Sequence, residues 1–289
     1  MATSLDIVFW DVQHGHSTYL STPNGRHIVV DLGIGAYSGK ADFSPLLHLK
    51  NKYSVAQLDY VVITHPHVDH IDDIFNFSSL SPKVLCRPKH LDRTPILSSG
   101  RTEEKKILEK YFEISDSYNE PIPDDSPNNP RNPANWGGVA ITIFSPTKCG
   151  ESNLNNHSIV ALFEYKGMKV LIPGDNELPS WNELKEQTVF LSSTKDIDVL
   201  LAPHHGRDSG FDNDTIANFN PRLTIISDGR FGDSSAASRY SAKTRGWKVH
   251  KRNSTDEERK CVTTRSDGVI VAKIGENDDG SRFLSITID

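Results

Sequence analysis

The sequence predicts an α/β fold in which β-sheets lie inside and helices lie outside, in layers. Strand-like segments dominate residues 1–64, and the second half alternates strand-like with helix-like segments. The segment YVVIT at 60–64 is apolar on both faces, which is typical of a strand buried between two layers. Two β-rich halves with helices between their strands therefore favour stacked sheets covered by helices.

The first half opens with three expected strands. Residues 5–10 form the first, and residues 16–21 and 26–31 form a hairpin that turns at TPNG. Asn-Gly is a strong turn signal, because both residues tolerate the positive φ that a tight hairpin turn requires. A short helix is expected over 42–53, before the strand at 60–64.

The clearest helix is expected over 101–114, and an irregular segment follows it. Residues 119–135 are dense in Pro, Asn and Asp, a composition that predicts a long loop. We interpret residues 92–137 as a lid-like insertion in one domain spanning 1–289, because segments on both sides supply residues to one site. In the second half, strands are expected over 139–144, 158–165, 168–172, 198–202, 223–227, 269–274 and 283–288, and helices over 178–191 and 212–218.

Composition excludes several classes of protein. The chain has 289 residues, a net charge of -6 and 36% hydrophobic residues, which suits a globular core without disulfides. No apolar run approaches the roughly 20 residues of a membrane helix, and no signal peptide is visible. The three cysteines are far apart and form no CxxC pair, so we expect a reducing, cytoplasmic location. A nucleic-acid partner would need a local positive feature on this acidic chain.

The strongest chemical signal is an HxHxDH motif directly after the strand at 60–64. Its chance expectation from composition is roughly 0.002, which argues against ordinary loop histidines. A loop leaving a sheet can turn alternate side chains inward, so His65 and His67 can hold one metal ion, and Asp69 and His70 a second. Imidazole and carboxylate ligands suit zinc, manganese or iron.

Three later segments offer further ligands. Asp175 ends the segment MKVLIPGD, where its carboxylate can bridge two ions, and the pair His204-His205 follows the segment DVLLAP. His157 precedes a strand and can complete the first ion's ligands. Paired ions roughly 3.5–4 Å apart promote displacement at phosphorus or carbonyl centres. We therefore expect two divalent ions, with Zn²⁺ favoured and Mn²⁺ as the alternative.

The order of these motifs resembles that of the metallo-β-lactamase-fold hydrolases. Within them, it is most similar to the soluble hydrolase domain of ComEC-type competence proteins and its stand-alone relatives. FWDVQHGHS at 9–17 resembles the group's DVGQGDS, and VVDLG at 29–33 resembles the DxG that follows. NNHSIVAL, LIPGD, APHHG and TRSDGVI then occur in the family's order. The resemblance implies a four-layer αββα sandwich with the site at one edge of the two sheets.

The resemblance also implies roles for individual residues. Asp31 would orient a ligand histidine. By analogy with family members that read His-x-Gly, His204 would bind metal, and His205 would lie outside the ligands, because adjacent residues of an extended segment point to opposite sides. The implied ligands are His65, His67 and His157 for metal one, Asp69, His70 and His204 for metal two, and Asp175 as the bridge.

The chain departs from the family pattern at three places. QHGH at 13–16 stands where the group has GQGD, which makes His14 and His16 candidate substrate contacts. DD at 72–73 stands where Gly-Gly is usual, and we expect these carboxylates to cap the next helix. RD at 207–208 follows the HHG motif where Ser-Arg is frequent.

The expected reaction is hydrolysis by a hydroxide that two ions generate near neutral pH. Asp69 and Asp175 would orient this hydroxide, and a metal ion or a protonated His205 would stabilise the leaving oxygen. The electrophile would be phosphorus or a carbonyl carbon. We favour phosphorus, and so a phosphodiesterase or nuclease, partly by family analogy.

A basic stretch also favours a nucleic-acid or nucleotide substrate. Residues 239–252 carry six cations with aromatic residues between them, a pattern that can follow a single strand through phosphate contacts and base stacking. Lys248, Lys251 and Arg252 are its candidate contacts. A solvated surface face is the alternative, because three acidic residues follow at 256–258.

Two other functions are kept open by the sequence. A hydrolase of small esters, lactones, amides or thioesters would use the same metals and would need an apolar pocket beside them. A non-catalytic metal-binding scaffold would bind metal and hydrolyse nothing; the retention of every expected ligand type argues against it.

Overall fold

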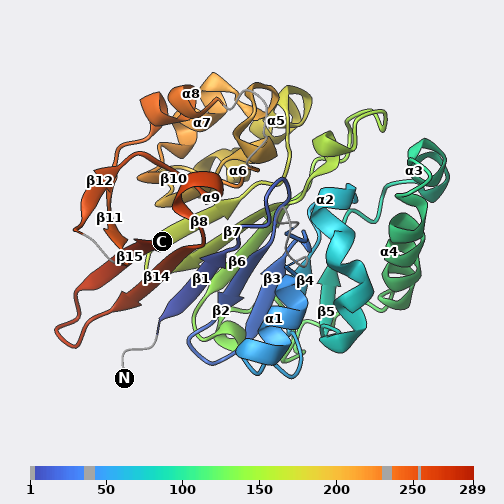
Figure 1. Cartoon of the computed structure of the whole chain (residues 1–289), viewed down its shortest axis with the longest axis horizontal. Helices are drawn as coiled ribbons and strands as arrows, with labels where there is room; N and C mark the ends of the chain where they lie inside the picture. Colours follow the sequence, from blue (N-terminus) through green and yellow to red (C-terminus); the bar gives the residue numbers. More distant parts are fainter. Residues whose placement is uncertain (1–3, 36–42, 230–235, 253–254) are drawn as a thin grey trace.

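Two β-sheets stack face to face in the computed structural model, which describes residues 4–35, 43–229, 236–252 and 255–289 (Figure 1). The larger sheet has nine strands, in the order β12 (Glu257–Arg259), β11 (Trp247–Lys251), β15 (Arg282–Ile288), β14 (Ile270–Glu276), β1 (Leu5–Phe9), β2 (Thr18–Ser21), β3 (His27–Val30), β4 (Tyr60–Val62) and β5 (Val84–Cys86). The smaller sheet has six, in the order β13 (Cys261–Thr263), β10 (Leu223–Ile226), β9 (Val199–Leu201), β8 (Met168–Ile172), β7 (Val160–Tyr165) and β6 (Ala140–Phe144).

Each sheet has a run of parallel strands that extends to one of its outermost strands, and these runs decide where the site forms. β3, β4 and β5 run parallel in the larger sheet, and β8, β9, β10 and β13 run parallel in the smaller one. The carboxyl ends of parallel strands meet at one edge, where the following loops bring their side chains together. The predicted hairpin forms, with β2 paired to β3 and Gly25 at φ 78° in its turn.

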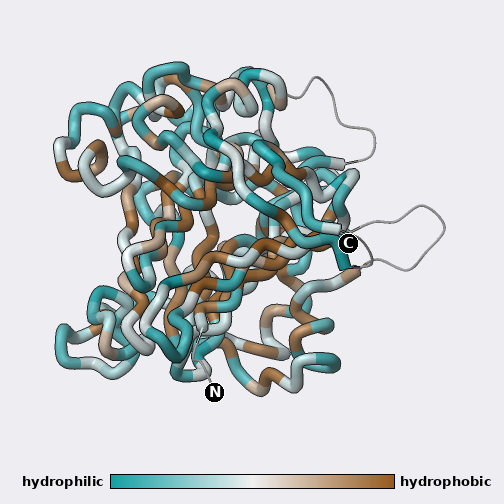
Figure 2. Tube along the Cα trace, turned by 90° about the vertical axis from the view of Figure 1, so that its left-hand side faces the viewer, coloured by the Kyte–Doolittle hydropathy of each residue, from teal (hydrophilic) through white to brown (hydrophobic). Residues whose placement is uncertain are grey.

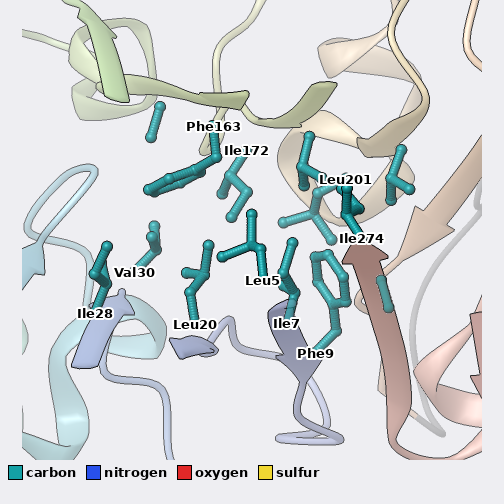
Figure 3. Close-up of a cluster of buried hydrophobic side chains, with 14 of the residues drawn as sticks. Leu5, Ile7, Phe9, Leu20, Ile28, Val30, Phe163, Ile172, Leu201 and Ile274 are labelled. Atoms are coloured by element: carbon teal, nitrogen blue, oxygen red, sulfur yellow. The ribbon is translucent and has the colours of Figure 1, made fainter. Parts of the chain in front are cut away.

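Three apolar clusters separate four layers, and they confirm the αββα arrangement. The first fills the space between the sheets and includes Leu5, Ile28, Phe163, Ile172 and Leu201 (Figure 3). The second lies between the larger sheet and one set of helices, and the third between the smaller sheet and the other set. Hydrophobic segments accordingly run through the interior, and hydrophilic ones lie toward the outside (Figure 2).

Helices cover both outer faces of the sandwich. The larger sheet is covered by α1 (Pro45–Lys52), α2 (Val68–Ile71), α3 (Arg93–Ser99) and α4 (Lys105–Ser117). On the side of the smaller sheet lie α5 (Leu178–Lys185), α6 (Thr188–Ser193), α7 (Asn213–Phe219) and α8 (Ala237–Lys243), and the short α9 (Thr264–Asp267) follows β13. In the described parts of the chain, no helix has the length and apolarity needed to cross a membrane.

Several predicted elements differ in their bounds. The helix predicted over 178–191 is two helices, and the break between them lets Trp181 of α5 and Phe190 of α6 stack at a centroid distance of 6.4 Å. The helix predicted over 42–53 begins at Pro45 after a Ser44 cap, and the first predicted residue, Asp42, lies outside the described residues. The strands β5, β11, β12 and β13 were not predicted from the sequence.

The region predicted as a lid has two parts with different positions. Helices α3 and α4 pack on the larger sheet next to η1 (Asp72–Ser79), close to the HxHxDH loop. The loop at 119–135 instead reaches the β2–β3 turn, where Asn24 Nδ2 donates to the Asn135 carbonyl at 2.9 Å. Trp136 anchors it, because this side chain is fully buried and its Nε1 donates to the Asn129 carbonyl. That turn lies at the edge opposite the carboxyl ends, so the loop does not cover the site.

Candidate metal centre

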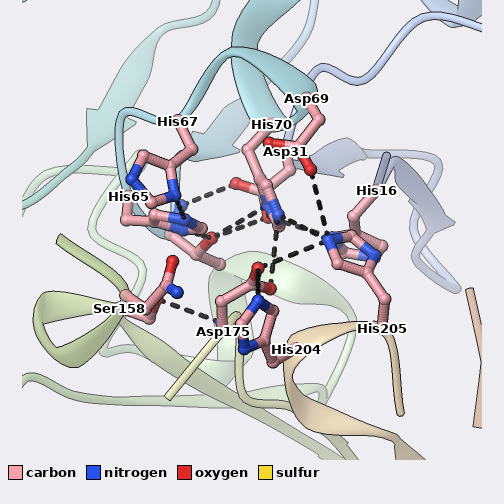
Figure 4. Close-up of polar contacts among 12 residues, drawn as sticks. His16, Asp31, His65, His67, Asp69, His70, Ser158, Asp175, His204 and His205 are labelled. Carbon is pink, nitrogen blue, oxygen red and sulfur yellow. Dashed lines mark hydrogen bonds and ion pairs between the residues drawn. The ribbon is translucent and has the colours of Figure 1, made fainter. Parts of the chain in front are cut away.

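The histidines and aspartates of the motifs gather at the carboxyl ends of the parallel strands (Figure 4). Asp31 follows β3, and the HxHxDH motif follows β4, both in the larger sheet. Asp175 follows β8, and the HHG motif follows β9, both in the smaller sheet. The cluster therefore joins the two sheets, and each sheet contributes part of it.

Asp31 is the buried centre of the hydrogen bonds on the larger sheet's side. Its Oδ1 accepts from the Thr64 backbone N–H at 2.6 Å, and its Oδ2 accepts from Thr64 Oγ1 at 2.7 Å. The same Oδ2 lies 2.8 Å from His70 Nδ1 and 2.9 Å from His16 Nδ1. Burial alone would raise the pKa of Asp31, but His70 and His16 outweigh it and hold the pKa well below its usual range. The ionised carboxylate fixes the proton of His70 on Nδ1 and leaves Nε2 free.

His205 is positioned in the same way from the smaller sheet. Its Nδ1 donates to the Ser227 carbonyl at 3.1 Å, which leaves Nε2 as the free nitrogen. That Nε2 lies 3.3 Å from His70 Nε2, 3.4 Å from Asp69 Oδ2 and 3.3 Å from Asp175 Oδ2. Two imidazole nitrogens and two carboxylates thus converge on one point between the sheets. We call Asp69, His70 and His205 site two.

The charges at site two show what the cluster lacks without a cation. Burial lowers the pKa of His205, but the carboxylates of Asp175 and Asp69 outweigh it and raise the pKa to about 9. Burial also lowers the pKa of His70, but the carboxylates of Asp175, Asp31 and Asp69 outweigh it and raise this pKa well above the usual value. These raised pKa values mean that the carboxylates favour positive charge at this point. A divalent cation supplies the same positive charge, and the ligand set of nitrogen and carboxylate oxygen fits it.

His65 and His67 form the other half of the centre, which we call site one. His65 Nε2 lies 3.0 Å from His67 Nδ1, and His65, His70 and Asp175 offer ligand atoms within 4.8 Å of one another. Burial lowers the pKa of His67 and lowers that of His65 well below its usual value, so both rings are neutral. Neutral imidazole is the form that binds metal.

Two glycines allow these loops to pack closely. Gly174 has φ 59°, and a Cβ there would lie 2.8 Å from the Cβ atoms of both Ser158 and Thr64. A Cβ at Gly15 would lie 2.5 Å from the Asp69 carbonyl oxygen. The chain can therefore turn into Asp175, and bring the loop at 13–16 against the HxHxDH loop, only with glycine at these positions.

The HHG turn places its histidines differently from the sequence-based expectation. His204 and His205 have φ values of 49° and 53°, so the segment is a left-handed turn and not extended. The alternation rule for extended chains therefore does not apply, and His205, not His204, reaches Asp69 and His70. His204 lies beside them, with Nδ1 at 2.9 Å from Glu177 Oε1 and Nε2 at 3.9 Å from Asp175 Oδ2.

His157 is not brought into the cluster. It is buried, and its Nδ1 lies 2.9 Å from His90 Nε2, while its Nε2 lies 3.4 Å from the Gly150 carbonyl. Both ring nitrogens thus have partners away from His65 and His67. The neighbouring Ser158 does serve the centre, because its Oγ accepts from the Asp175 backbone N–H at 3.0 Å.

The two unusual histidines of the opening segment have different positions. His16 is 3% exposed and bonded to Asp31 and Thr18, so it supports the ligands and does not face a substrate. His14 is half exposed, and its Nε2 lies 3.9 Å from Asp69 Oδ2 and accepts from Arg207 Nη2 at 3.0 Å. The two departures from the family pattern, at 13–16 and at 207–208, therefore meet at the mouth of the centre.

The basic stretch lies elsewhere. β11 is separated from β1 by two strands in the sheet order, and its cations are paired with carboxylates. Lys248 lies 3.4 Å from Asp256, Lys251 lies 2.9 Å from Glu257, and Arg252 lies 2.7 Å from Asp289. This arrangement fits the solvated-surface alternative and not a phosphate-binding strand track.

The expectation for Asp72 and Asp73 also needs correction. Asp73 accepts from Ser44 Oγ and from the Leu46 N–H, so it stabilises the start of α1, an earlier helix. Asp72 accepts from the Ile34 N–H, and burial raises its pKa to about 7.

A pocket of about 470 Å³ opens beside His67 and Asp69. His14 and Asp72 lie on its polar side, and Arg101 and Glu104 lie at the start of α4. The remaining wall is largely apolar and is lined by Pro66, Val68, Ile96, Leu108 and Leu154. Helices α3 and α4 thus supply much of the wall next to the metal ligands.

Sequence reasoning missed four residues that hold or flank the ligands. Thr64 and Ser158 stand directly beside predicted motif residues, and each binds an aspartate of the centre. Their position next to His65 and His157 was a usable signal. Arg207 was noted only as a departure from the family pattern, and Glu177 had no comparable signal, because its partner His204 comes from a separate loop.

Comparison with known proteins defines the class. Residues 11–210 match the family model of the metallo-beta-lactamase superfamily, and the chain belongs to this superfamily. Its members are mostly metal-dependent hydrolases that bind divalent metals, which agrees with the His and Asp clusters described above.

Particular relatives extend this result. Recombination protein 2 of Haemophilus influenzae is 31% identical over 222 residues, which are 76% of this chain and 24% of that protein. ComE operon protein 3 of Bacillus subtilis is 24% identical over 237 residues, 76% of this chain and 28% of that protein. The chain thus spans about a quarter of the length of these relatives.

Two solved structures align with much of the chain. Zn²⁺-bound PqqB from Methylobacterium extorquens aligns with a TM-score of 0.49 and 10% identity, covering 91% of this chain and 99% of that one. YhfI from Bacillus subtilis aligns with a TM-score of 0.44 and 14% identity, covering 79% and 88%.

Proposed function

We propose that the protein is a dinuclear metal-dependent hydrolase that cleaves phosphodiesters. One observation carries this proposal: Nε2 of His205 meets Nε2 of His70 between the carboxylates of Asp69 and Asp175, at 3.3–3.4 Å. A buried group of this composition, built from both sheets, is suited to a cation and unsuited to ordinary packing.

The geometry supports a revised set of ligands. Site two would use Asp69, His70 and His205, with Asp175 shared between the ions. Site one would use His65 and His67, with His204 in the place that the sequence suggested for His157. Glu177 lies beside Nδ1 of His204, so the Nε2 atom of His204 faces Asp175 and is free to bind an ion.

The chain's own residues would position the reaction. When bound, the two ions supply a nucleophile at neutral pH and neutralise charge on the scissile group. Asp31 keeps His70 in one orientation through Nδ1, and Ser227 does the same for His205. Asp69 and Asp175, each beside His205 Nε2, would orient the nucleophile.

An anionic substrate is supported by the contact between His14 and Arg207. Arg207 donates to His14 Nε2, and His14 lies over His205 at a ring distance of 5.0 Å. This puts a guanidinium at the mouth of site two, where it can neutralise a phosphoryl oxygen. The name of Recombination protein 2 refers to recombination, a process of nucleic acids, and so supports the same class of substrate. A nucleotide or a short single strand fits better than a long single strand. A long strand would need further phosphate contacts, and the cations at 248–252 are already paired with carboxylates.

A second candidate is supported by the apolar wall of the pocket. Ile96, Leu108 and Leu154 lie beside His67, which would suit a small neutral ester, lactone, amide or thioester. This candidate predicts turnover that hardly changes with salt, since no charged contact would bind the substrate.

A paired assay distinguishes the candidates. The protein loaded with Zn²⁺ or Mn²⁺ is tested on bis(p-nitrophenyl) phosphate and on p-nitrophenyl acetate. We expect phosphodiester turnover, and we expect Arg207→Ala to raise KM for the phosphodiester by about tenfold, the usual scale of a charged hydrogen bond, without affecting acetate. Arg131→Ala, in the exposed loop, is the matched control.

Three results would contradict the proposal. Acetate turnover without phosphodiester turnover would favour the second candidate. Bound metal without turnover of either substrate would support a scaffold. An unchanged KM in the Arg207 variant would remove the argument for anion recognition.

A further inference from the structure

A second polar hollow lies at the edge of the smaller sheet opposite the metal centre. It has a volume of about 400 Å³ and lies at the amino ends of β8, β9 and β10, whereas the metal ligands follow their carboxyl ends. Four cations from four separate segments line it: Lys169, Lys195, Arg222 and Arg245. Only Arg245 belongs to the basic stretch at 239–252, and none of the four lies in β11.

Two carboxylates lie in the hollow, and both are already engaged. Asp198 is buried, accepts from the Lys169 backbone N–H at 2.8 Å and lies 3.1 Å from Arg222 Nε. Asp196 accepts from Asn220 Nδ2 at 2.8 Å. Four positive and two negative side chains leave an excess of two positive charges, in a chain whose net charge is -6.

Backbone carbonyls fix the positions of two of the cations, Lys169 and Arg245. Arg245 donates from Nε to the Asn220 carbonyl and from Nη2 to the Ile197 carbonyl, and Lys169 Nζ donates to the Lys195 carbonyl. Within the described residues, Lys169, Lys195 and Arg245 have no carboxylate at ion-pair distance. Their charge is thus not cancelled locally, unlike that of Lys248, Lys251 and Arg252.

The pKa of Asp196 reports the field in the hollow. The hydrogen bond from Asn220 lowers this pKa first, and the positive charges of Lys195, Arg245 and Lys169 lower it further. A second anion placed in the hollow would experience the same attraction.

We propose that this hollow is a binding site for a small phosphorylated ligand of nucleotide size. A free phosphate fills only part of 400 Å³, whereas a nucleoside diphosphate offers two phosphoryl groups to the four cations that line the hollow. The site is separate from the metal centre, and its ligand is bound and not turned over there, since the catalytic ligands are at the other edge. The proposal does not depend on which bond the metal centre hydrolyses.

Calorimetric titration tests the proposal with ADP and inorganic phosphate as probes, on the metal-loaded and the metal-free protein. Without metal, the catalytic edge lacks the ions that would hold a phosphoryl group, and Arg207→Ala removes the guanidinium at its mouth. ADP binding by the metal-free Arg207→Ala variant therefore reports on the hollow. We expect saturable ADP binding in both forms, stronger than that of phosphate and weaker at high salt. The double variant Lys195→Ala/Arg245→Ala should weaken it by about tenfold or more, because two charged hydrogen bonds to the phosphoryl groups are removed.

Matched variants make the result decisive. The double variant Lys50→Ala/Lys52→Ala removes two positive charges from exposed positions of α1 and should leave ADP binding unchanged. Arg245→Lys keeps the charge, so it should bind ADP better than Arg245→Ala if the charge matters and the double variant is not simply misfolded. Equal ADP affinity in the wild type and the double variant would overturn the proposal. Loss of ADP binding in Arg207→Ala, or binding of single-stranded DNA without binding of ADP, would also overturn it.

Discussion

The two halves of the metal centre differ in charge and in the groups that hold them. At site one, burial keeps His65 and His67 neutral, with their facing nitrogens 3.0 Å apart. At site two, burial is outweighed by the carboxylates around His205, and its pKa rises to about 9. Site one can therefore accept a cation as it stands, whereas site two must exchange protons for it. The affinities of the two sites for their ions should therefore differ in their dependence on pH and on individual ligands.

The largest effect is expected from removing the carboxylate that the two halves share. Asp175→Ala should abolish activity, by more than the roughly 10–100-fold that the loss of a supporting residue costs, and should lower the metal content of both sites. Metal analysis and turnover measure this, with the exposed Asp278→Ala as the control. Near wild-type activity in the Asp175 variant would show that the two halves share no bridge.

Variants of His204 and His205 should affect different halves of the centre. His205→Ala should lose the ion of site two, and His204→Ala the ion of site one, so each variant should retain about one of two ions. Metal content per chain after dialysis measures this for each variant. His157→Ala should keep both ions, because its ring nitrogens face His90 and Gly150. Loss of metal in the His157 variant alone would restore the ligand set expected from the sequence.

A smaller effect on zinc affinity is expected from Asp31, which supports His70 of site two. Asp31→Asn removes the negative charge that holds Nδ1 of His70 and of His16, and an amide is nearly the same size. Zinc affinity should fall by about 10–100-fold, the scale of such supporting residues. Competition with a chromophoric chelator measures the affinity. An unchanged affinity would mean that the orientation of His70 is set by packing alone.

The smallest effect is a dependence of zinc stabilisation on pH. In the metal-free protein, the raised pKa of His205 stabilises the fold fully below its unfolded value of 6.5, and this contribution is lost as the pH rises through about 9. Zinc needs the deprotonated ring, so its own contribution grows over the same interval. The rise in Tm on adding zinc should therefore increase between about pH 6 and about pH 9. An equal rise at both pH values would contradict the proton exchange at site two.

The sequence predicts the ligands that lie next to a strong local pattern, and it fails where the backbone conformation decides. The HxHxDH motif and Asp175 follow apolar strands, so strand order alone brings them to one edge. His204 and His205 are adjacent, and which of them reaches His70 depends on two positive φ values that no motif reveals. The positions of His157 and of the loop at 119–135 depend on contacts with His90 and Asn24, which are distant in the chain.

The most direct test of the account is anomalous diffraction from crystals of the zinc-loaded protein. We expect two peaks, both near Asp175. One should lie beside His65, His67 and His204, and the other within bonding distance of Asp69, His70 and His205. A single peak, or a second peak bound by His157 with His205 left outside, would contradict it.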